Sequence, residues 1–171
     1  ENTVAAVPPG TLAPNGRNHY RVFTPYWRRW REEPLPAILD PPAQLTLPDG
    51  VAPGPLPFVH DSAGGETAGR GRLSDWLAHG VGDYDDRRDD LAADGSSRLS
   101  AHLHFGCLSA TEVITRARAF GPAADPFVRQ LCWRDFYLQL LAANPRLATE
   151  DLHPRRRDWN DDDAAFALWR E

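Results

Sequence analysis

Two blocks of residues in this chain carry groups that could hold a ligand. The first is Ser96-Ser97-Arg98-Leu99-Ser100, in which hydroxyl side chains and an arginine precede an apolar run. Hydroxyls, a guanidinium and the free N–H groups at the start of a helix together bind phosphate oxygens well. Serines also cap ordinary helices, and from chemistry alone capping is the commoner explanation of such a block.

The second block places flat and polar groups together on one expected helix. Gln130, Trp133, Arg134 and Tyr137 recur at i, i+3, i+4 and i+7 and would share one helix face. An amide, a guanidinium and two aromatic rings could grip a nucleobase or the ring system of a cofactor. A rim of amphipathic side chains, with Arg134 paired to an acid such as Asp135, explains the pattern equally well.

Metal binding is not favoured by the histidines or by the acidic runs. His102 and His104 would point apart on a helix, and no further His or Cys lies near them in the sequence. Residues 158–162 begin like a calcium loop, but Asp163 stands where that loop needs glycine. The chain also lacks the glycine-rich nucleotide loops and the common hydrolase and zinc-protease motifs.

The charge of the chain limits its partners. It has 24 acidic residues, 19 arginines and no lysine, which gives a formal net charge of −5. This balance argues against a generic nucleic-acid coat, although arginines cluster within 28–31, 87–88 and 155–157 and could form a local basic face. Cys107 and Cys132 lack CxxC spacing and lie beside apolar residues, so we expect buried, reduced thiols. No apolar run reaches the length of about eighteen residues that a membrane span needs.

Helical periodicity predicts the elements that carry these blocks. We expect helices over residues 24–32, 67–79, 84–91, 100–105, 109–119, 125–143 and 161–169. Ser109 is the expected N-cap of its helix, and Asp125-Pro126 begins the strongest helical pattern.

The core stripe of that strongest helix is predicted to consist of Phe127, Leu131, Leu138 and Leu141.

The remaining parts of the chain are expected to be extended. Thr3–Val7 could form a short strand, and the proline-rich residues 33–62 read as a linker. The chain contains no methionine and stops within an expected helix, so we expect it to be a segment of a longer protein.

A set of short blocks, in order along the chain, resembles the DNA photolyase and cryptochrome family. The blocks are PPG at 8–10, YRVFTPY at 20–26, GE at 65–66, Tyr84 with RRD at 87–89, SSRLS at 96–100, LHFG at 103–106 and RQLCWRDFY at 129–137, followed by Trp159 and Trp169. The similarity covers nearly the whole chain, and collinear blocks are more specific than any single motif.

The resemblance implies a mainly α fold and a division of the chain into three parts. Residues 1–33 would be the end of an α/β domain with the first connecting helix, and 34–63 the interdomain linker. Residues 64–171 would be the N-terminal half of the all-helical FAD-binding domain. An antenna chromophore of unknown identity would belong to the α/β domain.

The resemblance also implies roles for individual residues. Those matching FAD-binding positions are Tyr84, Ser96, Ser97, Arg98, Leu99, Ser100, Trp133 and Arg134. Those matching DNA-binding positions are Arg88, Gln130, Trp133 and Tyr137. Gln130 would take part in the reaction, and Trp159 matches the outermost member of the tryptophan chain that returns electrons to the flavin. No metal is implied.

The implied activity is that of a carbon–carbon lyase, in which light drives an electron from reduced FAD into a cyclobutane pyrimidine dimer flipped out of damaged DNA. Gln130 stands where many dimer-cleaving relatives have glutamate, which keeps a photolyase for (6-4) photoproducts open. A cryptochrome photoreceptor and a flavin-free helical interaction module remain alternatives. We expect the parent protein to be a monomeric, cytoplasmic bacterial protein without membrane contact, and the isolated segment to be inactive.

Overall fold

The structure, a computed structural model, describes residues 4–40, 43, 44, 46, 48–51, 54, 55, 64–154 and 162–170. The described part is helical and contains no β-strand, so the prediction of a mainly α fold is confirmed. Its elements are α1 (Phe23–Trp30), α2 (Gly65–His79), α3 (Tyr84–Arg87), α4 (Ser100–His104), α5 (Ala110–Phe120), the 3-10 helix η1 (Pro122–Ala124), α6 (Asp125–Ala143), the 3-10 helix η2 (Pro145–Ala148) and α7 (Asp163–Arg170).

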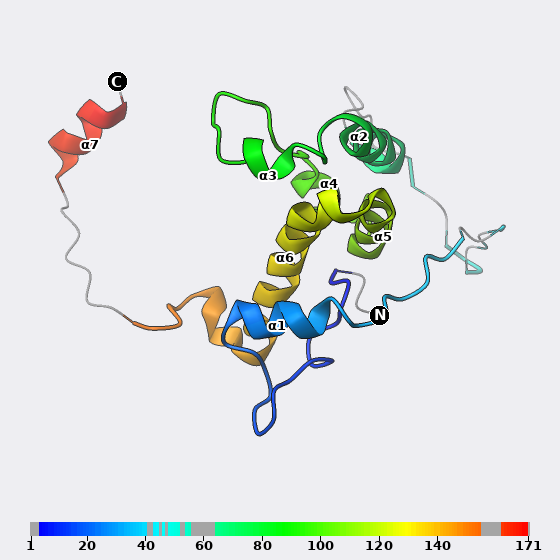
Figure 1. Cartoon of the computed structure of the whole chain (residues 1–171), viewed down its shortest axis with the longest axis horizontal. Coiled ribbons are helices and arrows are strands. Elements are labelled where there is room, and N and C mark those ends of the chain that lie inside the picture. Colours follow the sequence, from blue (N-terminus) through cyan, green and yellow to red (C-terminus); the bar gives the residue numbers. More distant parts are fainter. Residues whose placement is uncertain are drawn as a thin grey trace.

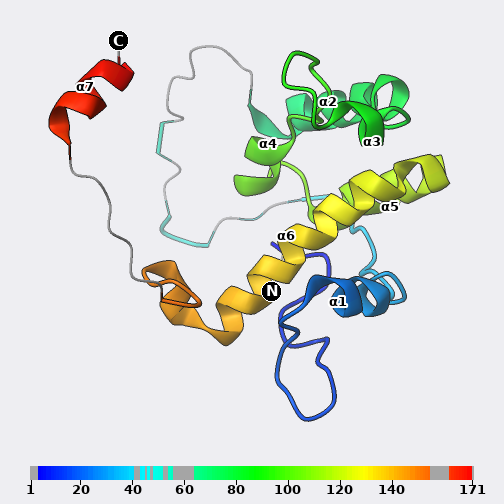
Figure 2. The same ribbon diagram turned by 60° about the vertical axis from the view of Figure 1, so that its left-hand side comes forward.

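Helix α6 is the axis on which the other helices are arranged. It packs against α1, α3 and α5, and α2 contacts α4 and α5. In Figure 1, α1 lies beside the lower part of α6, while α2, α3 and α4 lie around its upper end; in Figure 2, α1 lies below α6 and the other three helices lie above it. The second predicted block therefore sits on the element with the most neighbours.

The ends of α5 follow the capping rules that predicted them. The Ser109 hydroxyl accepts a hydrogen bond from the Glu112 backbone N–H at 3.0 Å. The helix ends at Gly121, whose φ of +100° is a conformation that other residues rarely adopt.

Helix α3 is shorter than predicted, because it ends at Arg87 rather than near Leu91. The Asp90 carboxylate accepts a hydrogen bond from the Ala92 backbone N–H at 2.9 Å. Aspartates that bond locally to the backbone in this way compete with helix continuation. The acidic run thus forms one helical turn and then a loop.

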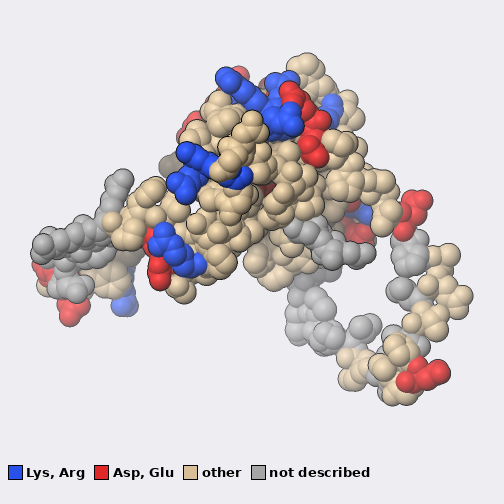
Figure 3. Space-filling view, turned by 90° about the horizontal axis from the view of Figure 1, so that it is seen from below, with Lys and Arg blue, Asp and Glu red and all other residues tan. Residues whose placement is uncertain are grey.

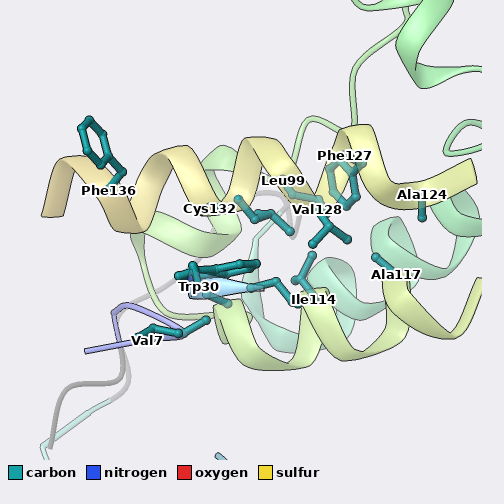
Figure 4. Close-up of a cluster of buried hydrophobic side chains, with 14 of the residues drawn as sticks. Val7, Trp30, Leu99, Ile114, Ala117, Ala124, Phe127, Val128, Cys132 and Phe136 are labelled. Atoms are coloured by element: carbon teal, nitrogen blue, oxygen red, sulfur yellow. The ribbon is translucent and has the colours of Figure 1, made fainter. Parts of the chain in front are cut away.

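The hydrophobic core lies between α6 and α5 and is closed by Trp30 of α1 (Figure 4). The predicted stripe on α6 is only half right. Phe127 and Leu131 are buried, whereas Leu138 is half-buried and Leu141 is 40% exposed. Because α1 and α5 cover adjacent sides of α6, the buried stripe instead continues through Cys132, Phe136 and Leu140.

The N-terminal segment is held by a side chain of α6 and not by a sheet. Residues 4–7 form no strand, and Thr3 lies outside the described residues. The Asp135 carboxylate accepts hydrogen bonds from the backbone N–H groups of Ala6 at 3.3 Å and Val7 at 2.9 Å, and from the Trp30 indole at 2.9 Å. Burial raises the pKa of Asp135 while these donors oppose the shift.

A second buried side chain of α6 holds the chain just before α1. The Gln139 amide accepts a hydrogen bond from the Tyr20 N–H at 3.1 Å and donates one to the Tyr20 carbonyl at 2.7 Å. This pair imitates a backbone ladder with a side chain, so the segment needs no neighbouring strand.

The predicted division into three parts is not visible as a break in the core. α1 belongs to the predicted first part, yet Phe23, Tyr26 and Trp30 lie in one hydrophobic cluster with residues of α2, α5 and α6. The division itself stays a prediction. No residue of α7 is buried, and no helix among the described residues has the length and apolar character needed to cross a membrane.

The prediction for the cysteines is right for one of the two. Both thiols are free, and Cys132 is buried, but Cys107 is partly exposed.

Candidate functional site

A cavity of about 800 Å³ lies where the serine block and α4 face α6. Its walls are formed by Val4, Tyr84, Ser96, Ser97, Arg98, Leu99, Ser100, Ala101, Leu103, His104, Phe127, Gln130, Leu131, Arg134 and Leu138. The two blocks singled out in the sequence thus meet at one hollow, although about thirty residues separate them in the chain.

The serine block approaches the end of α3 so closely that only glycine fits before it. A Cβ atom on Gly95 would lie 2.4 Å from the Arg87 carbonyl oxygen. Arg98 has a φ of +53°, and its Nε donates to the Asp94 carboxylate at 2.7 Å. A left-handed arginine at a ligand-facing loop is the kind of backbone strain that structures keep at binding sites.

Helix capping does not account for the serines. α4 has five residues and begins at Ser100, with no side-chain hydrogen bond at its N-cap, Leu99. The Ser97 hydroxyl accepts only a long hydrogen bond, of 3.4 Å, from the Leu99 N–H. The backbone carbonyl of Ser97 accepts a hydrogen bond from Arg72 Nε at 3.0 Å. Buried Leu99 anchors the block, while Ser96 and Ser100 are exposed at the cavity.

Tyr84 of α3 adds an aromatic side chain to the lining of the cavity. Its ring makes edge-to-face contacts with Trp76, at 5.7 Å between centroids, and Phe127, at 5.6 Å. Burial raises the pKa of Tyr84 and outweighs the opposing effect of Arg88. The hydroxyl therefore stays protonated and can donate a hydrogen bond.

The predicted face of α6 divides into two in the structure. Gln130 and Arg134 line the cavity, but Trp133 and Tyr137 do not. Trp133 instead stacks on Phe23 of α1, with centroids 3.6 Å apart and planes 6° apart, and it also contacts the Tyr137 ring, with centroids 5.6 Å apart and planes 25° apart. Tyr137 is 61% exposed, so this aromatic stack ends at the surface.

Arg134 joins the cavity to the N-terminal segment. Its guanidinium donates a hydrogen bond to the Val4 carbonyl, and Val4 also lines the cavity. The alternative pairing with Asp135 is a 4.0 Å contact. Because Asp135 is engaged by three other donors, Arg134 is not committed to that carboxylate.

Arg88 does not line the cavity. Arg88 lies in a separate groove and forms ion pairs with Asp85 at 3.3 Å and Asp89 at 3.7 Å. Trp159 lies outside the described residues.

Several cavity residues are not among the predicted site residues. Phe127, Leu131 and Leu138 belong to the predicted core stripe, and Leu103 and His104 follow the serine block. For the three residues on α6, the helical spacing relative to Arg134 is the signal that places them on the same face as the cavity. Within the described ranges no group of three or more His, Cys, Asp or Glu residues could hold a metal ion.

On the face that Figure 3 presents, arginines lie beside carboxylates. On this face the charges are mixed, so an anion site there would be a local arrangement of arginines.

Comparisons with known proteins give a consistent result. No family model matches the chain. The chain is 44% identical, over 98% of its length, to a deoxyribodipyrimidine photo-lyase of Streptomyces griseus. It is 34% identical, over 95%, to that of Halobacterium salinarum. In each case it spans 39% of the relative.

A solved structure shows the same arrangement of helices. A bacterial class III photolyase from Agrobacterium tumefaciens superposes with a TM-score of 0.83 at 26% identity, over 98% of this chain and 39% of that one. The fold and the cavity define a helical segment in which one side of α6 opens to a hollow. The chain belongs to the DNA photolyase and cryptochrome family.

Proposed function

We propose that this chain is part of a deoxyribodipyrimidine photolyase and forms one half of its FAD cavity. The observation that carries the proposal is the meeting of Tyr84, the serine block 96–100, Gln130 and Arg134 around one hollow. The names of the relatives support dimer repair, and no described residue favours a cryptochrome or a (6-4) photolyase.

The residues present fit FAD in size and in chemistry. The cavity of about 800 Å³ lies in the range of roughly 300–1,000 Å³ that ligand sites occupy. Ser96, Ser97, Ser100 and Arg98 offer hydroxyl and guanidinium groups for the diphosphate. Phe127 and Leu131 offer apolar walls for flat rings.

Bound FAD, when reduced and excited by light, would supply the electron that splits the dimer. The chain would contribute position and electrostatics. Arg98 and Arg134 would compensate the diphosphate charge, and the protonated Tyr84 hydroxyl would donate a hydrogen bond. Gln130, exposed at the cavity, would bond the polar edge of the substrate or the flavin.

The aromatic stack next to the cavity is proposed to meet DNA. Trp133, supported by Phe23, would stack on the flipped dimer, and Tyr137 would extend this surface. Arg88 would contact a phosphate, and Trp159 would return electrons to the flavin.

The same proposal includes an antenna chromophore bound outside these residues. It also includes a monomeric protein that works on damaged DNA in the bacterial cytoplasm, without a membrane.

The test is light-dependent repair by the complete protein. FAD-loaded protein is mixed with a duplex carrying one thymine dimer, and restored strands are counted after blue light and after darkness. The expected result is repair in the light alone. A protein that takes up no flavin, or that leaves the dimer intact while acting on a (6-4) photoproduct, would contradict the proposal.

A further inference from the structure

Arg72 of α2 reaches the serine block from outside the cavity. Its Nε donates a hydrogen bond of 3.0 Å to the backbone carbonyl of Ser97, while its Nη1 lies 3.8 Å from the Asp75 carboxylate. Among the described residues, it is the only side chain outside residues 96–100 that hydrogen-bonds to the backbone of the block. Arg72 does not line the cavity, so it can influence a ligand there only through the block.

The close packing of α2 on α4 places Arg72 beside the block. Gly69 lies about one turn earlier on α2, and a Cβ atom on it would lie 3.1 Å from His102 Nδ1 of α4. The buried residues of α2 are Gly69, Leu73 and Trp76. The Arg72 side chain borders this buried stripe and is 33% exposed, so its hydrogen bond to Ser97 is partly shielded from water.

The carbonyl that Arg72 holds belongs to the peptide unit at which the chain turns left-handed. This unit joins Ser97 to Arg98, and the φ of Arg98 is +53°, which residues with a Cβ atom disfavour. Because the unit is planar and trans, fixing the Ser97 carbonyl also fixes the Arg98 N–H, which points the opposite way. That N–H has no acceptor among the described residues and stays available to a ligand.

The other contacts of the block do not hold this peptide unit. Gly95 abuts the end of α3 and Leu99 is buried in the core, so they fix the two sides of the block. The ion pair of Arg98 with Asp94 is 66% and 59% exposed, and such pairs contribute little to stability. A strained loop keeps its conformation only where its surroundings hold it, and at its centre that contact comes from Arg72.

We propose that Arg72 is a positioning residue for the diphosphate of the bound dinucleotide, because it holds the Ser97–Arg98 peptide unit in the conformation that receives phosphate oxygens. The inference rests on the proposed function and deepens it, since it assigns a preference for a dinucleotide to a residue that touches no ligand. Without the hydrogen bond the block would occupy its binding conformation for a smaller fraction of the time. The apparent affinity for a diphosphate falls with that fraction.

The experiment compares three probes on the complete protein freed of cofactor: FAD and riboflavin by flavin fluorescence, and ADP by calorimetry. ADP carries a diphosphate without a flavin, and riboflavin carries the flavin ring without a phosphate. Arg72→Met removes the donor at nearly the same side-chain length. It should raise the Kd of FAD and of ADP about tenfold and leave the Kd of riboflavin unchanged. An equal loss for riboflavin would reveal a merely structural role and overturn the proposal.

Two further variants separate the hydrogen bond from the charge. Arg72→Gln is neutral but carries an amide N–H donor at the position of the arginine Nε, so it should keep most of the affinity for FAD and ADP. Arg116→Met is the matched control. It removes a guanidinium of almost the same exposure, 34%, which donates to the Ser74 hydroxyl of α2 at 2.8 Å, and it should bind all three probes normally.

The order of the Arg72 variants decides between the two explanations. Equal losses in Arg72→Met and Arg72→Gln would assign the effect to charge and contradict the positioning role. If Arg72→Met does not fold, Arg72→Lys takes its place, because it keeps the charge and moves the donor one bond further from the backbone. Arg72→Lys should then bind FAD more weakly than Arg72→Gln, and the reverse order would refute the proposal.

The outcomes also separate this inference from the proposed function. A protein whose binding of ADP depends on Arg72 as described, but which takes up no flavin, would support the positioning role and contradict a photolyase. A protein that repairs dimers and has the same Kd for FAD after Arg72→Met would uphold the photolyase and overturn the positioning role. A protein that binds neither FAD nor ADP would contradict both.

Discussion

The two sides of α6 do different work in this molecule. On one side Cys132, Asp135 and Gln139 are closed in by neighbouring segments and are at most 4% exposed. On the other side Gln130 and Arg134 face a cavity of about 800 Å³. Both carboxylate oxygens of Asp135 have donors, whereas Gln130 has no hydrogen-bond partner among the described residues. One side of α6 therefore contributes mainly to stability and the other mainly to binding. Substitutions on the first side should lower the free energy of unfolding, and substitutions on the second should weaken ligand binding.

The largest effect is expected on the closed side. Asp135→Ala leaves the N–H groups of Ala6, Val7 and Trp30 buried without an acceptor. At about 1–3 kcal/mol for each such donor, the free energy of unfolding should fall by at least ~3 kcal/mol. Urea denaturation measures the loss.

The control for that variant is Asp85→Ala, which removes an exposed carboxylate paired with Arg88 and should cost under about 1 kcal/mol. Equal losses for the two variants would contradict the account of the closed side.

On the open side, Arg134→Gln should weaken FAD binding with little effect on stability. A hydrogen bond to a charged group contributes about 1.5–3 kcal/mol, which is roughly a 10- to 150-fold change in Kd. Flavin fluorescence titration measures it. Arg146→Gln, which breaks an exposed pair with Glu150, is the matched control and should bind FAD normally. An unchanged Kd for Arg134→Gln would remove this residue from the cofactor site.

The position of the serine block depends on the close contact between Gly95 and the backbone of Arg87, which a methyl group on residue 95 would prevent. Gly95→Ala places a Cβ atom 2.4 Å from the Arg87 carbonyl oxygen. Thermal unfolding should show a loss of about 1–3 kcal/mol from this overpacking. Gly71→Ala, in α2 with nothing within 4 Å, should instead stabilise by about 0.5–1 kcal/mol. A neutral Gly95→Ala would mean that the block is not fixed against α3.

The smallest effect is a dependence of stability on alkaline pH. Burial raises the pKa of Cys132 above the ordinary thiol value of 9.0. When the pKa of a group is higher in the folded protein than in the unfolded chain, its full contribution to the free energy of unfolding is present at pH values below the unfolded-state pKa. The contribution is lost as the pH rises above that pKa, because only the unfolded chain then releases the proton. The loss should reach about 1.4 kcal/mol one pH unit above 9.0.

Cys132→Ala removes that part of the pH slope, whatever its effect on stability at neutral pH. Denaturation series between pH 8 and pH 10 for both proteins test this. Parallel curves would show that the thiol does not contribute.

Local rules predicted the helices well, because caps and apolar spacing act within a few residues. Ser109 caps α5 as expected, and α6 runs from Asp125 to Ala143. The same rules placed Gln130, Trp133, Arg134 and Tyr137 on one face. Spacing alone could not show that Phe23, about 110 residues earlier, takes Trp133 into an aromatic stack and leaves only Gln130 and Arg134 at the cavity.

The partners of the N-terminal segment were also beyond local rules. The pattern at Thr3–Val7 suits a strand, but a strand needs a neighbour, and here Asp135 supplies the acceptors. The close approach of Gly95 to Arg87 likewise could not be predicted from local spacing, because the tertiary fold brings this loop against the end of α3. Long-range contacts decided each of these points.

The most direct test of the account is a crystal structure of the complete protein with FAD. We predict that the diphosphate oxygens lie within hydrogen-bond distance of the serine block 96–100 and that Gln130 and Arg134 face the same ligand. FAD bound away from both α4 and α6 would contradict the assignment of the cavity.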